Sequence, residues 1–147
     1  MNWQDAFLRS ARSIVIYGLK RSGNGFAYDV LRGLQQSIPA PRITPVHLHA
    51  SSLGGMNCVL SAQQAVPKPD SAVIVLNSVD VPAALDNAAS AGVKRAWLVL
   101  KAAMPDNLAY AYRRGIDANG GCPLLFIEGL GFPHNFHRSL AKLFKRI

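Results

Sequence analysis

The sequence predicts an α/β fold of three layers, in which helices cover both faces of a mostly parallel sheet of about five strands. Short apolar runs rich in β-branched residues, such as residues 14–17 and 72–76, alternate with segments whose apolar residues recur at helical spacing. The second run is apolar throughout, which is typical of a strand that is covered on both faces. Strands that alternate with helices form βαβ units with right-handed crossovers, and such units make parallel sheets.

The composition limits the classes of protein and partner that suit the chain. Its 147 residues, half of them hydrophobic, suit one domain with a sizeable core, and no linker or repeat divides them. We therefore expect a single domain over residues 1–147. Sixteen Lys and Arg against eight Asp and Glu give a net charge of +8, which favours an anionic ligand or partner. The basic residues cluster only in pairs, so we do not expect a nucleic-acid partner.

The expected compartment and protein partners follow from the same reading. No apolar run approaches the roughly 20 residues that cross a membrane, and the first residues do not resemble a secretory signal. Cys58 and Cys122 match no metal or redox spacing, and Cys122 is expected to be a core thiol. We expect a basic cytoplasmic protein with no membrane partner. A protein partner would be a second copy of the chain in a homodimer, or an acidic protein.

The N-terminal part of the chain predicts a helix, a strand and a second helix. Trp3, Phe7 and Ala11 share one helical face, so we expect a short helix over residues 2–11. Residues 14–17 form the first predicted strand. The helix after it carries apolar residues on one face, at i, i+3, i+4 and i+7 spacing: Ala27, Val30, Leu31 and Leu34.

Four further strands are predicted after that helix. Residues 42–48 form the second strand of the chain, and Pro45 places it at an edge of the sheet or near a strand end. Residues 49–69 contain several Gly and Pro residues and predict loops. The later strands are expected at residues 71–76, 96–100 and about 123–127.

Three helices are predicted in the second half of the chain. Ser78 and Asp80 are candidate caps for the first of them, and Gly92 suits its C-terminal end. Pro105 opens the next helix, which ends near Gly115. Its inward-facing residues are expected to be Leu108, Ala111 and Tyr112. The final segment is an amphipathic C-terminal helix, expected to cover one face of the sheet with Phe136, Leu140, Leu143, Phe144 and Ile147.

A glycine-rich turn joins the first strand to the helix that follows it. Gly18, Gly23 and Gly25 permit backbone conformations that are closed to other residues, so the turn can expose its N–H groups. Those groups and the positive end of the helix make an anion site. Lys20 and Arg21 add two positive charges there. The turn therefore predicts a phosphate-binding site of a nucleotide-binding fold.

The turn matches neither of the two familiar nucleotide-binding patterns. Its glycines do not give GxGxxG. They begin as GxxxxG, but Asn24 and Gly25 replace the Lys and Ser/Thr that a Walker loop needs for phosphates and magnesium, which disfavours an ATPase or GTPase. The acidic residue that binds the ribose of NAD is also missing, since no carboxylate lies between Asp29 and Asp70. Arg42, His47 and His49 lie there instead. A basic rim suits a ribose with an additional phosphate, as in NADP or coenzyme A.

Several stretches between residues 10 and 128 occur in a characteristic order and spacing. The most telling is the segment from Ala88 to Leu98, AASAGVKRAWL, in which a helix end, a glycine and a strand follow one another. The others are residues 14–18 with 25–31, residues 44–47, and residues 115–116 with 121–123. Together they resemble the stand-alone CoA-binding domains, which are related to the CoA-binding domain of the succinyl-CoA synthetase alpha subunit.

This resemblance implies a Rossmann-like fold that lays coenzyme A, or an acyl-CoA, across the carboxyl ends of the strands. It implies that residues 18–22 hold the pyrophosphate. It also implies that His47 neighbours the ribose and that residues 76–79 flank the adenine. The residues expected to bind the cofactor are Gly18, Leu19, Lys20, Arg21, Ser22, Gly23, Gly25, Phe26, His47, Leu76, Asn77, Ser78 and Val79.

We expect neither catalytic residues nor a metal site. The catalytic histidine of the related synthetases lies in a second domain, outside the resembling stretches. His134 and His137 lie at i, i+3 spacing near Glu128, but no third ligand at a convincing spacing accompanies them. The favoured hypothesis is a non-catalytic binding or regulatory module for coenzyme A. The alternatives are an NADP-binding enzyme or sensor, and an interaction protein that has lost its ligand.

Overall fold

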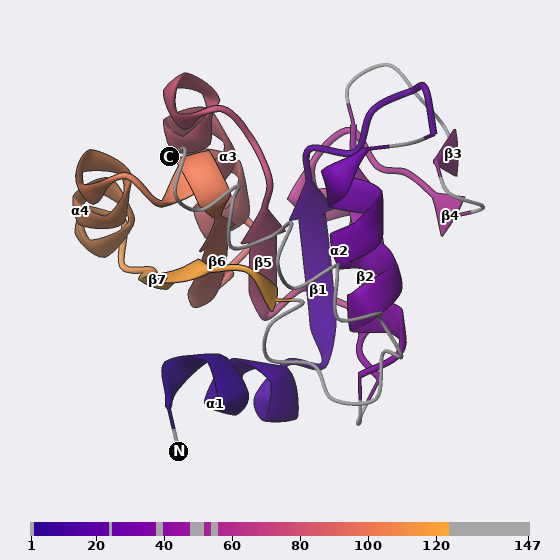
Figure 1. Ribbon diagram of the computed structural model, residues 1–147, viewed down its shortest axis with the longest axis horizontal. Coiled ribbons are helices and arrows are strands. Elements are labelled where there is room, and N and C mark those ends of the chain that lie inside the picture. Colours follow the sequence, from indigo (N-terminus) through magenta and orange to yellow (C-terminus); the bar gives the residue numbers. More distant parts are fainter. Residues whose placement is uncertain (1, 24, 38–39, 48–51, 54–55, 124–147) are drawn as a thin grey trace, which may run out of the picture.

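The computed structural model of the chain describes residues 2–23, 25–37, 40–47, 52–53 and 56–123. Its centre is a sheet of five parallel strands in the order β2-β1-β5-β6-β7 (Figure 1). The strands are β1 (Ser13–Tyr17), β2 (Arg42–Val46), β5 (Ser71–Ile74), β6 (Arg95–Val99) and β7 (Asp117–Gly121). A separate antiparallel pair is formed by β3 (Ser52–Leu53) and β4 (Met56–Asn57). The predicted parallel α/β sheet is confirmed.

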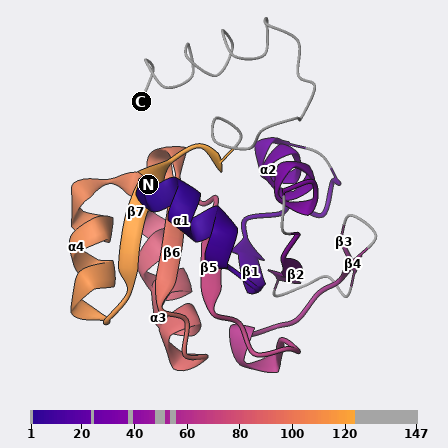
Figure 2. The same ribbon diagram turned by 90° about the horizontal axis from the view of Figure 1, so that it is seen from below.

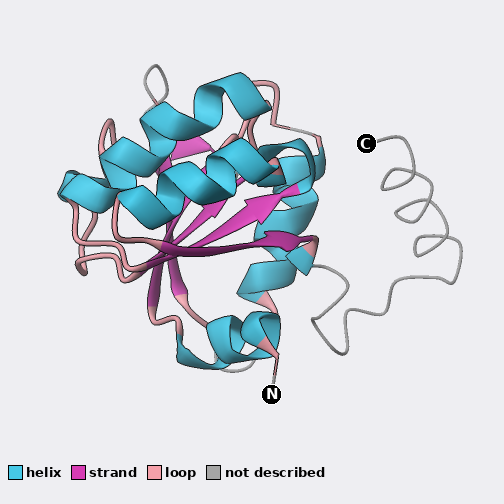
Figure 3. Cartoon of the chain, turned by 90° about the vertical axis from the view of Figure 1, so that its left-hand side faces the viewer, coloured by secondary structure: helices cyan, strands magenta, loops and turns pink. Residues whose placement is uncertain are grey.

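Helices cover both faces of the sheet, which confirms the predicted three layers (Figure 2, Figure 3). One face carries α1 (Trp3–Ser10) and α2 (Phe26–Gln35), and the other carries α3 (Val81–Ser90) and α4 (Pro105–Arg113). Successive side chains of a strand point to opposite faces. In β1, Ile14 and Ile16 belong to the apolar cluster under α1 and α2. Val15 and Tyr17 belong to the cluster under α3 and α4.

The N-terminal helix α1 leads into the start of β1 and lies across the face of the sheet in front of β6 (Figure 2). Its first turn is capped by Asn2, whose side chain accepts a hydrogen bond from the amide of Asp5 at 2.8 Å. Trp3 and Phe7 stack with ring centroids 5.3 Å apart, and both meet Trp97 of β6 edge-on. The predicted short helix is therefore confirmed, and its aromatic face covers β6.

The helices of the second half begin and end much as predicted. Gly92 follows α3 with a φ of +87°, and its amide donates to the carbonyl of Ala89 at 3.0 Å. Pro105 opens α4, and Gly115 follows that helix with a φ of +76°. Asp80 takes the N-cap position of α3, but its side chain makes no capping hydrogen bond.

Strand β2 lies at the edge of the sheet, as its proline predicts. Pro45 is in register with Ile16 of β1, and its carbonyl accepts a hydrogen bond from the amide of Val59 at 3.0 Å. The amide of His47 donates to the carbonyl of Val59 at 2.9 Å. The segment around Val59 therefore protects part of the outer edge. The strand ends at Val46, and the end predicted at residue 48 lies outside the described residues.

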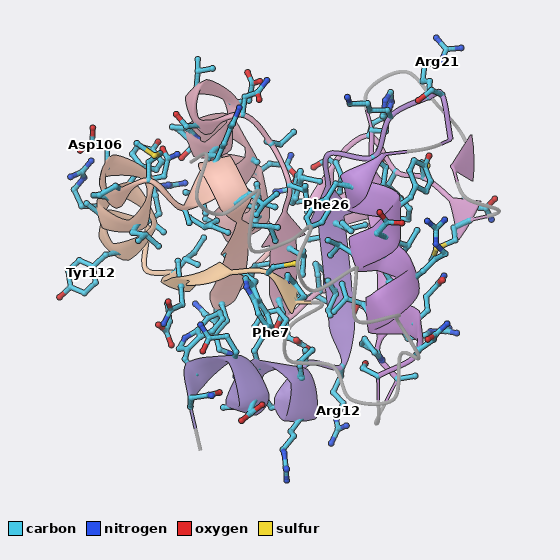
Figure 4. The ribbon with its side chains drawn as sticks, viewed as in Figure 1. Phe7, Arg12, Arg21, Phe26, Asp106 and Tyr112 are labelled. Atoms are coloured by element: carbon cyan, nitrogen blue, oxygen red, sulfur yellow. The ribbon has the colours of Figure 1, made fainter. Side chains whose placement is uncertain are left out.

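One prediction for the C-terminal half is wrong, and one strand there was not predicted. Tyr112 is 83% exposed and points away from the body (Figure 4), because α4 turns the face with Asn107 and Ala111 inward. The last strand of the described sheet is Asp117–Gly121, a segment for which no strand was predicted. This segment, DANGG, has no β-branched residue, and its pairing with β6 makes it a strand.

The remaining C-terminal predictions concern residues 124–147. The predicted strand after Pro123, the amphipathic helix, and the group of His134, His137 and Glu128 lie outside the described residues. Cys122 is fully buried, as predicted for a core thiol. In the part of the chain that the structure describes, no helix is both long enough and apolar enough to span a bilayer.

Candidate functional site

A cavity of about 970 Å³ opens at the carboxyl edge of the sheet. The chain leaves β1 toward the edge strand β2 on one side, whereas it leaves β5 toward β6 on the other. This reversal of strand order is the point at which open α/β sheets bind their ligands. The lining comes from the ends of β1, β2, β5 and β6 and from the first turns of α2 and α3.

The glycine-rich turn forms one wall of this cavity. Gly18, Gly23 and Gly25 have φ angles of +112°, +78° and +113°, which confirms that the turn uses conformations reserved for glycine. Gly18 also lies so close to β5 that a Cβ atom there would overlap the carbonyl oxygen of Val75. No described atom lies within 4 Å of a Cβ built on Gly23 or Gly25. Gly18 is therefore required by close approach and conformation, and the other two by conformation alone.

The start of α2 faces the cavity beside this turn. Gly25 is the N-cap, and no side chain caps the helix there. Phe26 and Ala27 of the first turn line the cavity. Tyr28 supports the turn from behind, since its hydroxyl donates to the carbonyl of Lys20 at 2.8 Å. The positive end of α2 is thus directed at the cavity, as an anion site requires.

Most of the residues predicted to bind the cofactor line this one cavity. They are Gly18, Leu19, Lys20, Arg21, Gly25, Phe26, His47, Leu76 and Asn77. Ser22, Gly23, Ser78 and Val79 are not part of the lining. Val79 is 81% exposed, and the carbonyl of Ser78 accepts a hydrogen bond from Asn107 at 3.0 Å. Ser78 and Val79 are the first two residues of the short helix η2 (Ser78–Asp80), whose third residue, Asp80, does line the cavity.

Sequence reasoning missed a polar network on the α3 side of the cavity. The hydroxyl of Tyr17 donates to Oδ1 of Asn87 at 2.7 Å, and the amide of Ala62 donates to the same oxygen at 3.0 Å. Nδ2 of Asn87 donates to Oγ of Ser61 at 3.1 Å. Tyr17 is buried, and burial raises the pKa of its hydroxyl above the ordinary value. An Asn in the otherwise Ala-rich α3 is the signal that could have identified this network.

A strained residue lies on the opposite wall. Leu100, directly after β6, has a φ of +56° and is the one described residue other than glycine with a positive φ. A leucine in this conformation costs about 1–2 kcal/mol. Such strain concentrates at functional sites, where the surrounding structure holds it. Leu100 and its neighbours Val99 and Lys101 all line the cavity.

The charges around the cavity are mostly positive. Lys20 and Arg21 are exposed on the turn after β1, and Arg21 points outward at its tip (Figure 4). Lys101 follows β6, and His47 follows β2. Asp80 is the one acidic residue in the lining. The site therefore attracts anions, with one carboxylate placed among the cations.

The described residues hold no group of three or more His, Cys, Asp and Glu side chains that could bind a metal ion. The cavity lining contains amides, cations, apolar side chains and one carboxylate. Such a lining can bind a phosphorylated ligand with apolar parts, because cations and N–H groups hold phosphates while apolar side chains contact the rest.

The fold occurs in several solved structures. Prb, a protein redesigned for binding, has a TM-score of 0.74 and 17% identity, over 88% of this chain and 94% of its own. A structure from Thermus thermophilus has a TM-score of 0.70 and 21% identity, over 85% of this chain and 96% of its own. The dinucleotide-forming acetyl-coenzyme A synthetase 1 of Ca. Korarchaeum cryptofilum, in complex with phosphate and ADP, has a TM-score of 0.67 and 22% identity. That match covers 82% of this chain but 28% of the synthetase.

A family model shows which protein family the chain belongs to. Among curated proteins, no match to the chain was found. The model of the CoA binding domain, however, matches residues 12–128, a range that extends from β1 to beyond β7. It includes the glycine turn, the lining of the cavity and the segment from Ala88 to Leu98. The chain therefore belongs to the CoA-binding domain family.

Proposed function

We propose that the chain binds coenzyme A, free or acylated, in the cavity at the carboxyl edge, and acts as a non-catalytic binding or regulatory module. Membership of the CoA-binding domain family supports coenzyme A as the ligand. The observation that carries the choice of site is the glycine turn, which borders the cavity at the switch point of the sheet. The cavity, at about 970 Å³, lies at the upper end of the range of about 300–1,000 Å³ for small-molecule sites.

The pyrophosphate is proposed to bind at the glycine turn. The positive φ of Gly18 and Gly25 opens the backbone there, and the uncapped start of α2 adds its N–H groups. Lys20 and Arg21 supply two cations at the same wall. His47, at the end of β2, is proposed to neighbour the ribose with its 3′-phosphate. No described carboxylate lies beside these groups in the lining of this wall, which suits a ligand with several phosphates.

NADP is the alternative ligand of the same general chemistry, and the family match does not support it. An enzyme that uses NADP would also need a second substrate and groups that promote hydride transfer to or from the nicotinamide. Coenzyme A requires only binding of its nucleotide and pantetheine arms. The measured preference between the two ligands tests this choice directly.

The experiment is a thermal shift and calorimetric titration of the full chain with coenzyme A, dephospho-CoA and NADPH. We expect coenzyme A to raise Tm the most and dephospho-CoA to raise it less, because binding only to the folded state stabilises that state. The double variant K20A/R21A should weaken binding of coenzyme A by about tenfold or more, since each charge-assisted hydrogen bond contributes about 1.5–3 kcal/mol.

The matched control is the double variant R12A/K94A. Arg12 and Lys94 are exposed at the amino edge of the sheet and outside the cavity lining, and Figure 4 shows Arg12 far from Arg21. This variant removes the same charge and should leave affinity within about twofold, because screening weakens distant charges. An unchanged Tm with millimolar coenzyme A, together with a shift by NADPH, would contradict the proposal. Equal losses in both double variants would contradict the proposed site.

A further inference from the structure

Asp80 is an acidic residue in a cavity that otherwise attracts anions. Lys20, Arg21 and Lys101 line the same cavity, and Asp80 is the one carboxylate among the described lining residues. A carboxylate repels a phosphate bound beside it, so Asp80 is suited to a part of the ligand that carries no negative charge. Its position follows β5, whereas the phosphate-binding turn follows β1.

The carboxylate of Asp80 makes no capping hydrogen bond and no salt bridge within the described residues. Asp80 occupies the N-cap of α3, a position where Asp normally accepts from the amides of the first turn. Its side chain makes no such hydrogen bond, and Pro82, the second helical residue, has no N–H to offer. No salt bridge involves Asp80 among the described residues, although Lys101 lines the same cavity. The carboxylate is exposed to the cavity rather than used by the helix.

The surroundings of Asp80 are suited to a flat aromatic base. Leu76, Ala83 and Ala84 line the cavity close to it in sequence and present apolar surface. Asn77 adds an amide that can donate and accept. A carboxylate accepts hydrogen bonds only, so it recognises a donor at the edge of the base. Of the ring substituents of adenine, the exocyclic amine is such a donor.

We propose that Asp80 is a specificity-determining residue, which accepts a hydrogen bond from the exocyclic amine of the adenine base of the ligand. This inference rests on the proposed function, since it assigns one end of the proposed ligand to one part of the cavity. The phosphates lie at the glycine turn, and the base lies over the start of α3. Repulsion between Asp80 and phosphate and its attraction for the amine both favour this direction of binding.

The experiment compares coenzyme A with 1,N6-etheno-CoA, in which the amine is closed into a ring and can no longer donate. The wild-type chain should bind coenzyme A about tenfold more tightly than the etheno analogue, since a hydrogen bond to a charged group contributes about 1.5–3 kcal/mol. D80A should reduce that ratio to within about twofold. D80N keeps one acceptor oxygen and should keep a ratio between those two.

The matched control is D106A. Asp106 is an exposed acid in the first turn of α4, outside the cavity lining, and Figure 4 shows it on the outer side of that helix. D106A removes the same charge from the start of a helix. The ratio of the affinities for coenzyme A and the etheno analogue should stay at the wild-type value. Because Asp80 makes no capping hydrogen bond, D80A should fold, and an unchanged circular dichroism spectrum checks this.

Two results would overturn the inference, and they differ in what they say of the proposed function. If coenzyme A binds and D80A keeps the wild-type ratio, Asp80 does not read the base, and coenzyme A binding stands. If neither ligand binds the wild-type chain, the proposed function fails and the role of Asp80 fails with it. A reduced ratio in D80A with a wild-type ratio in D106A supports the inference.

Discussion

The amino edge and the carboxyl edge of the central sheet differ in what their carboxylates and helix ends bind. At the amino edge, the carboxylate of Asp70 accepts hydrogen bonds from the amides of Arg12 and Ser13 and from the hydroxyl of Ser71. The hydroxyl of Ser13 donates to the carbonyl of Pro67 at 3.0 Å. Nearby, α1 packs its aromatic face onto β6. This edge is closed by hydrogen bonds and apolar contacts.

The carboxyl edge is open and carries strain. Leu100, directly after β6, is the one described residue other than glycine with a positive φ. Neither α2 nor α3 has a side-chain cap where it faces the cavity, and Asp80 remains exposed there. The comparison shows that the carboxylate at the amino edge binds amides of its own chain, whereas the carboxylate and the helix starts at the carboxyl edge face the cavity without a capping hydrogen bond.

The largest effect is expected in the aromatic cluster under α1. Phe7→Ala removes a fully buried ring that contacts Trp3 and Trp97, and should lower the free energy of unfolding by about 3–5 kcal/mol. Urea denaturation measures the loss. The affinity of the folded fraction for coenzyme A should stay within about twofold, because Phe7 is not part of the cavity lining. A large loss of affinity in fully folded Phe7→Ala protein would show that this aromatic cluster and the cavity are coupled.

Gly18→Ala is expected to lower both stability and affinity for coenzyme A at the carboxyl edge. The new Cβ would overlap the carbonyl of Val75 at a φ of +112°, so backbone strain should cost about 3 kcal/mol and coenzyme A affinity should fall at least tenfold. Gly23→Ala is the control, since it has the same kind of φ but no atom within 4 Å of the new Cβ. It should cost about 1 kcal/mol. Equal costs in denaturation would show that close approach does not matter.

Asp70→Ala tests how much the hydrogen bonds at the amino edge contribute to stability. It leaves the amides of Arg12 and Ser13 without their acceptor and should lower the free energy of unfolding by about 2 kcal/mol. Asp70→Asn keeps one acceptor oxygen and should lose less. Coenzyme A affinity, measured by calorimetry, should be unchanged in both. A stability equal to that of the wild type would mean that water replaces these hydrogen bonds without cost.

Tyr17→Phe is expected to have the smallest effect. It removes the hydroxyl that donates to Asn87 and should cost about 1 kcal/mol at pH 7. Burial raises the pKa of Tyr17 above its ordinary value of 10.0, so the folded state binds this proton more tightly than the unfolded state. Its stability contribution is fully present below pH 10 and declines as the pH rises above that value.

Denaturation between pH 9 and pH 11 checks this prediction. The wild-type chain should lose stability more steeply with rising pH than Tyr17→Phe, which lacks the titrating group. Tyr112→Phe is the control, because the Tyr112 side chain is 83% exposed. It should follow the wild-type profile. Identical slopes in the wild type and Tyr17→Phe would contradict the assigned cause.

Local patterns allowed much of the fold to be predicted. The apolar runs identified β1, β5 and β6, helical spacing identified α1 and α2, and the glycines identified the ends of α3 and α4. These features depend on neighbouring residues, so they can be read along the chain. The order of the elements then implied a parallel sheet with a crevice at its carboxyl edge, and that crevice contains most of the predicted residues.

Predictions failed where the pattern was weak or where distant segments meet. The segment DANGG becomes β7 because it pairs with β6, and nothing in its composition favours a strand. Tyr112 is exposed because the orientation of α4 is set by the buried Asn107 and Ala111. A helix of nine residues with apolar groups on several sides has more than one plausible inward face, and packing selects among them.

The sequence by itself determined the fold class, the glycine turn with its cations, and the resemblance to the CoA-binding domains, because each is a local pattern or an order of local patterns. Only the tertiary structure decided which other groups reach the cavity. Tyr17 meets Asn87 across 70 residues of chain. Leu100 takes its strained conformation, and Asp80 faces the cavity instead of capping α3. These features depend on contacts between distant segments, and patterns of neighbouring residues do not determine which segments meet.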